Sequence, residues 1–341
     1  MLSRVCSERH FLLCFLVFGF WFLASINTQG FKNIGGHLIY HDCDGKSITE
    51  LKEEFRRDGI VMFTPCSLSK SPNKVDSVSE FITRYCRGDR GEAFTTCNNR
   101  IVSSDYPAIL ELAADEEILL FIYLLHGRKP FPFQTLNFKY GTGQPMHSDL
   151  IHFAGWPSQT MTAAWIALED VSEASGPLEY FLGSHLEEFQ TMEKLSCPLG
   201  AYRSCYEAAL SLYIDKNKHR WRKAHMLPKK GQVVIWDSNT IHGGGFVTNE
   251  SVTRLSQVTH YFFEDDKFFF QPKLSVSKGG QFTEFSLRID VQGGSSADEI
   301  IARHWKPQSG LYSGHYPQYY SETLHDTKLF DLGIPVQQPN Q

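Results

Sequence analysis

The spacing of hydrophobic residues predicts a helix early in the chain. Ile48, Leu51 and Phe55 recur at helical intervals and therefore share one face. Ser47 opens a capping box directly before this stripe, and Gly59 follows it as a left-handed cap. We therefore expect a helix between Ser47 and Gly59.

Three further elements are expected in the same part of the chain. The run IVMF, at 60–63, predicts a buried strand, and a helix is expected over 76–86. A longer helix starts near Pro107, a residue that suits a first helical turn, and continues through the apolar run 118–125 to Gly127. That run is too short to span a bilayer, which favours a core helix.

From residue 131 onward the pattern changes to short strand-like runs separated by Gly, Pro, Ser and Asn. Such runs predict antiparallel strands and a mainly β fold with flanking helices, of the barrel or jelly-roll type. The core is expected over 131–270, after a helical N-terminal part at 30–130, with an insertion or lid at 186–230. Residues 271–341 are expected to form a C-terminal extension.

The first 29 residues have a pattern of their own. Arg4 and Arg9 precede fourteen consecutive apolar residues at 11–24, and small residues follow. This arrangement is typical of a signal peptide, with an uncleaved signal anchor as the alternative. We therefore expect a protein of the secretory pathway: lumenal in the endoplasmic reticulum, secreted, or held at the membrane by this segment.

The cysteines agree with an oxidising compartment. Six of the eight cysteines lie after residue 29 and could form three disulfides. Cys86 with Cys97 and Cys197 with Cys205 are the nearest neighbours in sequence, so they are the first candidates for pairing.

Charge narrows the possible partners. The formal net charge is −5, and the chain lacks the clustered basic residues of a nucleic-acid-binding protein. The short cluster around 220–223 is better explained as a solvated face. No pattern indicates a specific protein partner, and contact with a membrane is expected only if the N-terminal segment is an anchor.

Candidate chemistry begins with His147 and Asp149, two residues apart in the apolar run 143–153. In a strand, side chains two apart point to the same face. The pair could therefore offer a nitrogen and an oxygen ligand to one metal ion. A solvated strand edge is the alternative, because this short motif occurs often by chance.

Two residues further along strengthen the metal interpretation. His242 follows a predicted strand and precedes three glycines, which allow a close backbone approach. Arg254 lies in the next predicted strand. Two histidines and one carboxylate are the ligands of non-haem Fe(II) oxygenases, and a buried Arg matches a carboxylate bidentately. Alternatively, His242 is a loop histidine and Arg254 pairs with Glu169, Asp170 or Glu264.

The chain resembles the phytanoyl-CoA dioxygenase family in four stretches that follow one another in a fixed order. They are the motif HSD, the block 164–185 with GPLEYFLGSH, the segment KKGQVVIWDSNTIHGG and the strand TRLSQVTHYF. The resemblance covers roughly 131–265. It implies a double-stranded β-helix core of the jelly-roll or cupin type, and an enzyme that depends on Fe(II) and 2-oxoglutarate.

The resemblance also implies roles for individual residues. His147, Asp149 and His242 would be iron ligands, and Arg254 would bind the distal carboxylate of 2-oxoglutarate. Trp165 corresponds to a family tryptophan near the co-substrate, and Asn137 resembles an asparagine that contacts 2-oxoglutarate in ectoine hydroxylase. The family often has a residue with a hydroxyl group two positions after the second histidine. Here that position is Gly244, so a hydroxyl contact would come from another residue, with Thr253 and Thr162 as candidates.

The reaction implied is a dioxygenase reaction with Fe(II), 2-oxoglutarate and O2, supported by ascorbate. Relatives that halogenate have a small residue where Asp149 stands, so the resemblance implies hydroxylation of an unactivated C–H bond. The expected substrate is a small organic molecule. Two alternatives remain: a catalytically silent β-helix protein that binds a ligand or partner, and a zinc or manganese hydrolase.

Overall fold

The computed structural model describes residues 31–34, 37–85, 107–156, 158, 160–266, 268–273, 277–278 and 281–282. The predicted leader at 1–29, the predicted pair Cys86–Cys97 and most of the predicted extension at 271–341 lie outside these residues. None of the helices within them is long and apolar enough to cross a membrane.

The N-terminal part contains the predicted first helix with both of its caps. Helix α2 (Ile48–Asp58) begins after Ser47, whose side chain accepts from the backbone N–H of Glu50 in a capping box. Gly59 ends the helix in the left-handed conformation, with φ of 74°. Strand β3 (Ile60–Phe63) follows directly, as predicted. The next helices are α3 (Cys66–Ser69) and α4 (Pro72–Tyr85), and α4 begins about one turn before the predicted start.

The single long helix predicted from Pro107 to Gly127 is wrong, because the chain forms two helices there. Helix α6 (Pro107–Ala113) ends before Asp115, and α7 (Glu116–His126) begins after it. The Asp115 carboxylate accepts from the backbone N–H groups of Glu117 and Ile118, so it acts as an N-cap inside the apolar pattern. Gly127 ends α7 as expected, with φ of 66°.

The core consists of two antiparallel sheets, which confirms the predicted mainly β fold with flanking helices. The larger sheet has the order β3-β9-β6-β11-β4, and the smaller sheet has the order β10-β7-β8. Their strands are β4 (Pro130–Phe138), β6 (Thr162–Ala167), β7 (Leu178–Leu182), β8 (Arg222–Met226), β9 (Val233–Asp237), β10 (His242–Gly244) and β11 (Ser256–Phe263). Short two-stranded pairs complete the described strands: β1 (Phe31–Ile34) with β2 (His37–Tyr40), β5 (Ala154–Trp156) with β12 (Phe268–Phe270), and β13 (Ser277–Lys278) with β14 (Gln281–Phe282).

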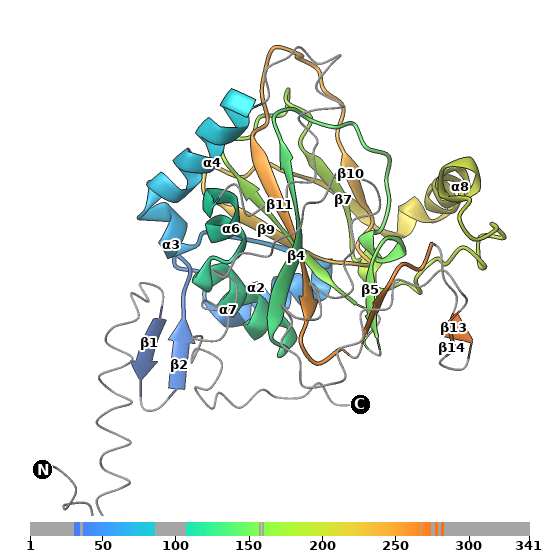
Figure 1. Cartoon of the computed structure of the whole chain (residues 1–341), viewed down its shortest axis with the longest axis horizontal. Helices are drawn as coiled ribbons and strands as arrows, with labels where there is room; N and C mark the ends of the chain where they lie inside the picture. The colour runs from blue at the N-terminus through green and yellow to red at the C-terminus, as the bar shows by residue number, and fades with distance from the viewer. Residues whose placement is uncertain are drawn as a thin grey trace, which may run out of the picture.

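Helices cover one face of the larger sheet and leave its other face for the site. The Gln257 side chain donates to the Ile109 carbonyl, and the Tyr261 hydroxyl donates to the Ala113 carbonyl, so odd-numbered residues of β11 face α6. Even-numbered residues of β11 therefore face the interior between the two sheets. Figure 1 shows α4, α6 and α7 on one side of the large sheet and α8 (Glu207–Asn217) on the other side of the molecule.

The predicted insertion contains α8 and a small hydrophobic core of its own. Tyr206, Leu210 and Ile214 pack there against Phe181 and Ile241, which belong to the β core. A disulfide joins Cys197 to Cys205, which confirms the predicted pair. The insertion is thus fixed to the smaller sheet by apolar contacts and closed on itself by a covalent bond.

Candidate metal centre

The segment that contains His147 and Asp149 is not the strand that its apolar pattern predicts. His147 exchanges two backbone hydrogen bonds with His242, at 2.8 and 2.9 Å, and Asp149 begins a short 3-10 helix. Ser148, between them, is extended, with φ of −112° and ψ of 135°. One extended residue is enough to turn its two neighbours to the same side. The predicted convergence of His147 and Asp149 therefore holds, although the predicted strand does not.

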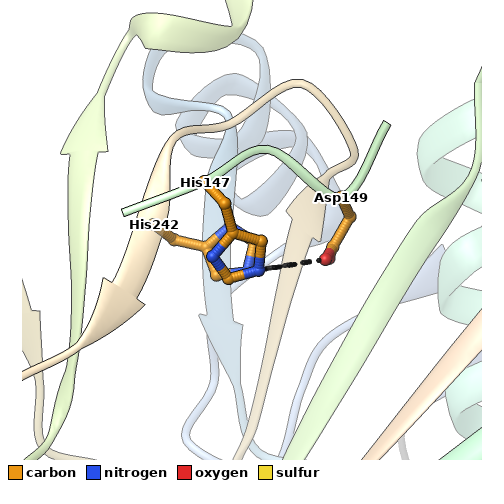
Figure 2. A group of neighbouring side chains, drawn as sticks. All are labelled: His147, Asp149 and His242. Atoms are coloured by element: carbon orange, nitrogen blue, oxygen red, sulfur yellow. Dashed lines mark ion pairs between the residues drawn. The ribbon is translucent and has the colours of Figure 1, made fainter. Parts of the chain in front are cut away.

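His147, Asp149 and His242 form a buried cluster with the geometry of a metal site (Figure 2). One ligand atom from each of them lies within 4.8 Å of the other two. Asp149 Oδ1 lies 3.5 Å from His147 Nε2, and Asp149 Oδ2 lies 3.6 Å from His242 Nε2. All three residues are less than 8% exposed. The backbone bridge between His147 and His242 explains how residues far apart in sequence meet here.

Backbone carbonyls set which imidazole nitrogen is available to an ion. His147 Nδ1 is 2.9 Å from the Pro145 carbonyl, and His242 Nδ1 is 2.9 Å from the Thr240 carbonyl. A carbonyl only accepts, so each Nδ1 carries a proton and each Nε2 presents a lone pair to the cluster. The Gln144 amide nitrogen lies 3.1 Å from His147 Nε2 and can donate to its lone pair until an ion binds there.

The charge of Asp149 dominates the electrostatics of the cluster. Burial alone would raise the pKa of Asp149, but His242, His147 and His260 outweigh it and hold this pKa well below its usual range. Burial lowers the pKa of His242 to about 4, against the opposing charge of Asp149. A carboxylate that stays ionised and a histidine that stays neutral are the forms that bind a metal cation.

Two residues that the sequence did not indicate hold the carboxylate in place. Trp236 donates its indole N–H to Asp149 Oδ2 over 2.8 Å, and His260 Nε2 lies 3.7 Å from the same oxygen. His260 lies on the interior face of β11, in alternation with Arg254. That alternation is the sequence signal that could have identified it.

Arg254 lies two residues before β11 and is 1% exposed. Its Nη1 donates to the Gly176 carbonyl over 2.6 Å, and its Nε has no hydrogen-bond partner within the described part of the chain. Burial lowers the pKa of Arg254 to about 10, so the guanidinium is still charged at neutral pH. A buried cation of this kind requires an anionic ligand.

The carboxylates considered as alternative partners of Arg254 are engaged elsewhere. Glu169 accepts from the Thr253 hydroxyl and the Leu255 N–H. Asp170 pairs with Lys229, and Glu264 pairs with Lys129. Among the described residues, Arg254 forms no ion pair, which leaves its charge for a bound molecule.

Trp165 lies beside Arg254, whereas Asn137 does not lie on the same face. The Arg254 guanidinium is 5.8 Å from the Trp165 ring centre, and the buried Trp165 indole N–H has no partner among the described residues. Asn137 lies opposite Gln257 in the register of β4 and β11, and Gln257 faces α6. Residues directly opposite in an antiparallel pair share a face. The structure therefore brings Trp165 to the site and places Asn137 on the helix-covered side.

The replacement of the family's hydroxyl residue by Gly244 also has a structural reason. A Cβ on Gly244 would lie 2.8 Å from the backbone nitrogens of Gly143 and Gln144, so a side chain has no room there. The predicted substitutes are already occupied: Thr162 donates to the Trp236 carbonyl, and Thr253 donates to Glu169.

The residues present fit an iron ion and 2-oxoglutarate on chemical grounds. Two Nε2 lone pairs and an ionised carboxylate form the donor set of a non-haem iron site. Arg254 Nε and the Trp165 N–H are buried donors without a partner in the described chain, on the same side of the larger sheet. An antiparallel jelly roll with this cluster between its sheets has the architecture of the metal-binding double-stranded β-helix class.

Comparison with known proteins finds one matching family model, over the central part of the chain. Residues 114–255 match the family model described as Phytanoyl-CoA dioxygenase (PhyH). This match supports the PhyH-like family that the motifs predicted. A search of curated protein sequences finds no match.

Several solved structures are similar to this chain. The epimerase SnoN, in complex with Fe3+, alpha ketoglutarate and nogalamycin RO, is 19% identical with a TM-score of 0.48, and the match covers 66% of this chain and 85% of SnoN. EctD from S. alaskensis, with 2-oxoglutarate and 5-hydroxyectoine, is 18% identical with a TM-score of 0.47, covering 63% and 76%. AviO1 from Streptomyces viridochromogenes Tue57 is 19% identical with a TM-score of 0.45, covering 64% and 96%.

Proposed function

We propose that this protein is a hydroxylase that converts an unactivated C–H bond of a small organic substrate into a C–OH group. The observation that carries the proposal is the complete and buried set of His147, Asp149 and His242, with the cation of Arg254 before β11, which forms no ion pair within the described part of the chain. A silent binding protein has no requirement for this set. A zinc or manganese hydrolase has no requirement for Arg254.

Each residue has a defined part in this reaction. His147, Asp149 and His242 would hold the metal, and Arg254 would bind and orient the distal carboxylate of 2-oxoglutarate. When bound, iron and 2-oxoglutarate supply the oxidising chemistry, in which 2-oxoglutarate and O2 yield succinate, CO2 and a hydroxylated substrate. The burial of the ligands and of Trp165 would exclude water from this region, which strengthens the charge interactions.

Asp149 supports hydroxylation over halogenation. Its carboxylate occupies the position that a halide would need, and Trp236 holds one of its oxygens by a hydrogen bond of 2.8 Å. A ligand fixed in this way is not readily displaced by a competing anion.

The side of the cluster next to His147 supports a small-molecule substrate. The His152 ring is 6.0 Å from the His147 ring, and the Tyr202 ring is 4.8 Å from the His152 ring. Tyr202 belongs to the insertion, so this segment contributes an aromatic side chain beside the candidate metal centre. A lid role for the insertion is consistent with this arrangement.

The test is the release of succinate by purified protein supplied with Fe(II), 2-oxoglutarate, O2 and ascorbate. Without substrate, we expect slow succinate formation. Once a substrate is supplied, we expect faster formation, with one succinate for each molecule of hydroxylated product. Mass spectrometry of a metabolite extract incubated with wild-type protein, and separately with the His147→Ala variant, should reveal a product heavier by one oxygen atom. Absence of both iron affinity and succinate release would favour the silent binding protein.

We also propose that the protein functions in the secretory pathway. The Cys197–Cys205 disulfide supports this location, since such bonds persist in oxidising compartments. Asn249, in the sequon Asn249-Glu250-Ser251, is exposed and would be accessible to glycosylation there. Expression in animal cells tests the proposal: a glycosidase should shift the mobility of the wild-type protein but not of the Asn249→Gln variant. An unmodified wild-type protein in the cytosol would contradict it.

A further inference from the structure

Tyr180 is a fully buried tyrosine whose hydroxyl has no hydrogen-bond partner among the described residues. Buried polar groups are almost always paired, because an unpaired group loses its hydrogen bonds to water without replacement. Within the described chain, no other buried side-chain hydroxyl lacks a partner in this way. The Tyr180 hydroxyl therefore requires an explanation.

The strand register places Tyr180 beside the metal ligands. Tyr180 lies opposite His242 in the pairing of β7 with β10, so the two side chains share a face. The Tyr180 ring is nearly parallel to the His242 ring, 5.8 Å away, and lies 5.9 Å from the Trp236 ring. Tyr180 thus lies on the face of the smaller sheet that carries the metal ligand His242.

Arg254 is tied to the chain segment that leads to Tyr180. Its Nη1 donates to the Gly176 carbonyl, and β7 begins two residues after Gly176. A tyrosine hydroxyl carries one proton that it can donate in a hydrogen bond. Tyr180 therefore lies on the strand that follows the Arg254 contact and shares a face with His242, where its hydroxyl can donate to a bound anion.

The positions at which the sequence analysis expected a hydroxyl cannot supply this contact. Gly244 has no room for a side chain, and the hydroxyls of Thr162 and Thr253 donate to protein acceptors. Among the described residues, the buried polar side chains without a complete set of partners on this side of the sheets are Tyr180, Arg254, Trp165 and His260, and Tyr180 is the only hydroxyl among them.

We propose that the Tyr180 hydroxyl donates a hydrogen bond to the distal carboxylate of 2-oxoglutarate, next to Arg254. This inference rests on the proposed function, because it assigns a further residue to the same co-substrate site. A carboxylate has enough lone pairs to accept from the guanidinium and the phenol together. Tyr180 would thereby replace the hydroxyl that the glycine at position 244 cannot provide.

The test uses protein loaded with Ni(II), which prevents turnover, and measures ligand binding by calorimetry. Two ligands are compared: 2-oxoglutarate, and 2-oxopentanoate, which keeps the chelating end and chain length but ends in a methyl group. Tyr180→Phe should weaken 2-oxoglutarate binding by about 10- to 100-fold, the range for a hydrogen bond to a charged group. Its binding of 2-oxopentanoate should equal that of the wild type. Tyr206→Phe is the matched control, because the Tyr206 hydroxyl donates to the Gln190 carbonyl in the insertion.

Each outcome has a separate meaning. An equal loss of affinity for both ligands would show that Tyr180 only packs against His242, and it would overturn the inference. Unchanged affinity for 2-oxoglutarate would overturn it as well. Retained 2-oxopentanoate binding by Tyr180→Phe serves as the check that the variant is folded. A wild-type protein that binds Ni(II) but not 2-oxoglutarate would instead contradict the proposed function.

Discussion

Trp236 and Asp149 are joined by a hydrogen bond of 2.8 Å from the indole N–H to the carboxylate Oδ2, within the protein interior. Trp236 belongs to β9, a strand of the larger sheet, whereas Asp149 begins a short 3-10 helix outside the sheets. The bond therefore fixes a loop residue to the rigid core. It also orients the carboxylate, so that Oδ1 faces His147 and Oδ2 faces His242.

Replacing Trp236 should weaken metal binding without removing a ligand. Trp236→Phe keeps an aromatic ring but loses the N–H, so Asp149 is held less firmly. Loss of an outer hydrogen bond of this kind reduces metal affinity by about 10- to 100-fold. Titration with Co(II), followed by its absorption spectrum, measures the effect. Trp221→Phe is the control, since Trp221 packs against Phe181 and Tyr213, away from the cluster. Equal affinities for the two variants would show that the bond has no role in the site.

The histidines of the cluster should be required for metal but not for the fold. His147→Ala and His242→Ala each leave only two ligands, so bound iron should be lost while circular dichroism stays unchanged. His152→Ala is a matched control, because its ring lies 6.0 Å from that of His147 but outside the cluster. Metal content after dialysis, measured by mass spectrometry, distinguishes these cases. Full metal content in His242→Ala would show that the ion binds elsewhere.

The sequence predicted the candidate ligands because their signal is local. His147 and Asp149 needed one extended residue between them, and Ser148 provides it. His242 needed a strand end followed by small residues. The three glycines leave room for the backbone of Gly143, Gln144, Met146 and Pro177, with which a Cβ would clash. None of these requirements depends on which strands pair with one another in the sheets.

The features that sequence reasoning missed depend on how strands pair. The face of Asn137 follows from its position opposite Gln257, and nothing in the local pattern of β4 fixes that register. Trp236 and His260 reach Asp149 from two strands on either side of β6, so their proximity appears only in the assembled sheet. The helix break at Asp115 was missed for a different reason, because apolar residues continue on both sides of the cap.

Arg254 should stabilise the complex with 2-oxoglutarate and destabilise the fold of the ligand-free protein. Arg254→Met removes a buried cation that has no carboxylate partner among the described residues. Without ligand, the free energy of unfolding of the variant should therefore exceed that of the wild type by about 1 kcal/mol or more. Its affinity for 2-oxoglutarate should fall by about 2–5 kcal/mol, the cost of removing one partner of a buried charge pair. Denaturant unfolding and calorimetry with Ni(II)-loaded protein measure the two effects.

Arg128→Met is the control for this charge effect. Arg128 pairs with Asp265 and Asp266, so its removal should lower stability and leave 2-oxoglutarate affinity unchanged. An Arg254→Met variant that keeps its 2-oxoglutarate affinity would show that the co-substrate carboxylate binds at another residue.

His126 should make the fold sensitive to acid. It ends α7 and packs between Phe55 and Phe263, at ring distances of 5.3 and 4.9 Å, and its Nε2 is buried without a partner among the described residues. Burial, with a smaller effect of Arg128, lowers the pKa of His126 to about 3. In the unfolded chain a histidine has a pKa of about 6.5. Below about pH 6.5 the unfolded state therefore takes up the proton first, and stability falls as the pH drops toward 3.

The loss due to His126 should approach about 1.4 kcal/mol for each pH unit within this window. His126→Phe keeps a ring between Phe55 and Phe263 but cannot titrate, so it should retain more stability at pH 5 relative to pH 7.5 than the wild type does. His219→Gln, at an exposed histidine, should follow the wild type. Urea unfolding at the two pH values gives the comparison. Parallel losses in the wild type and in His126→Phe would mean that the acid sensitivity of the fold originates from other buried groups.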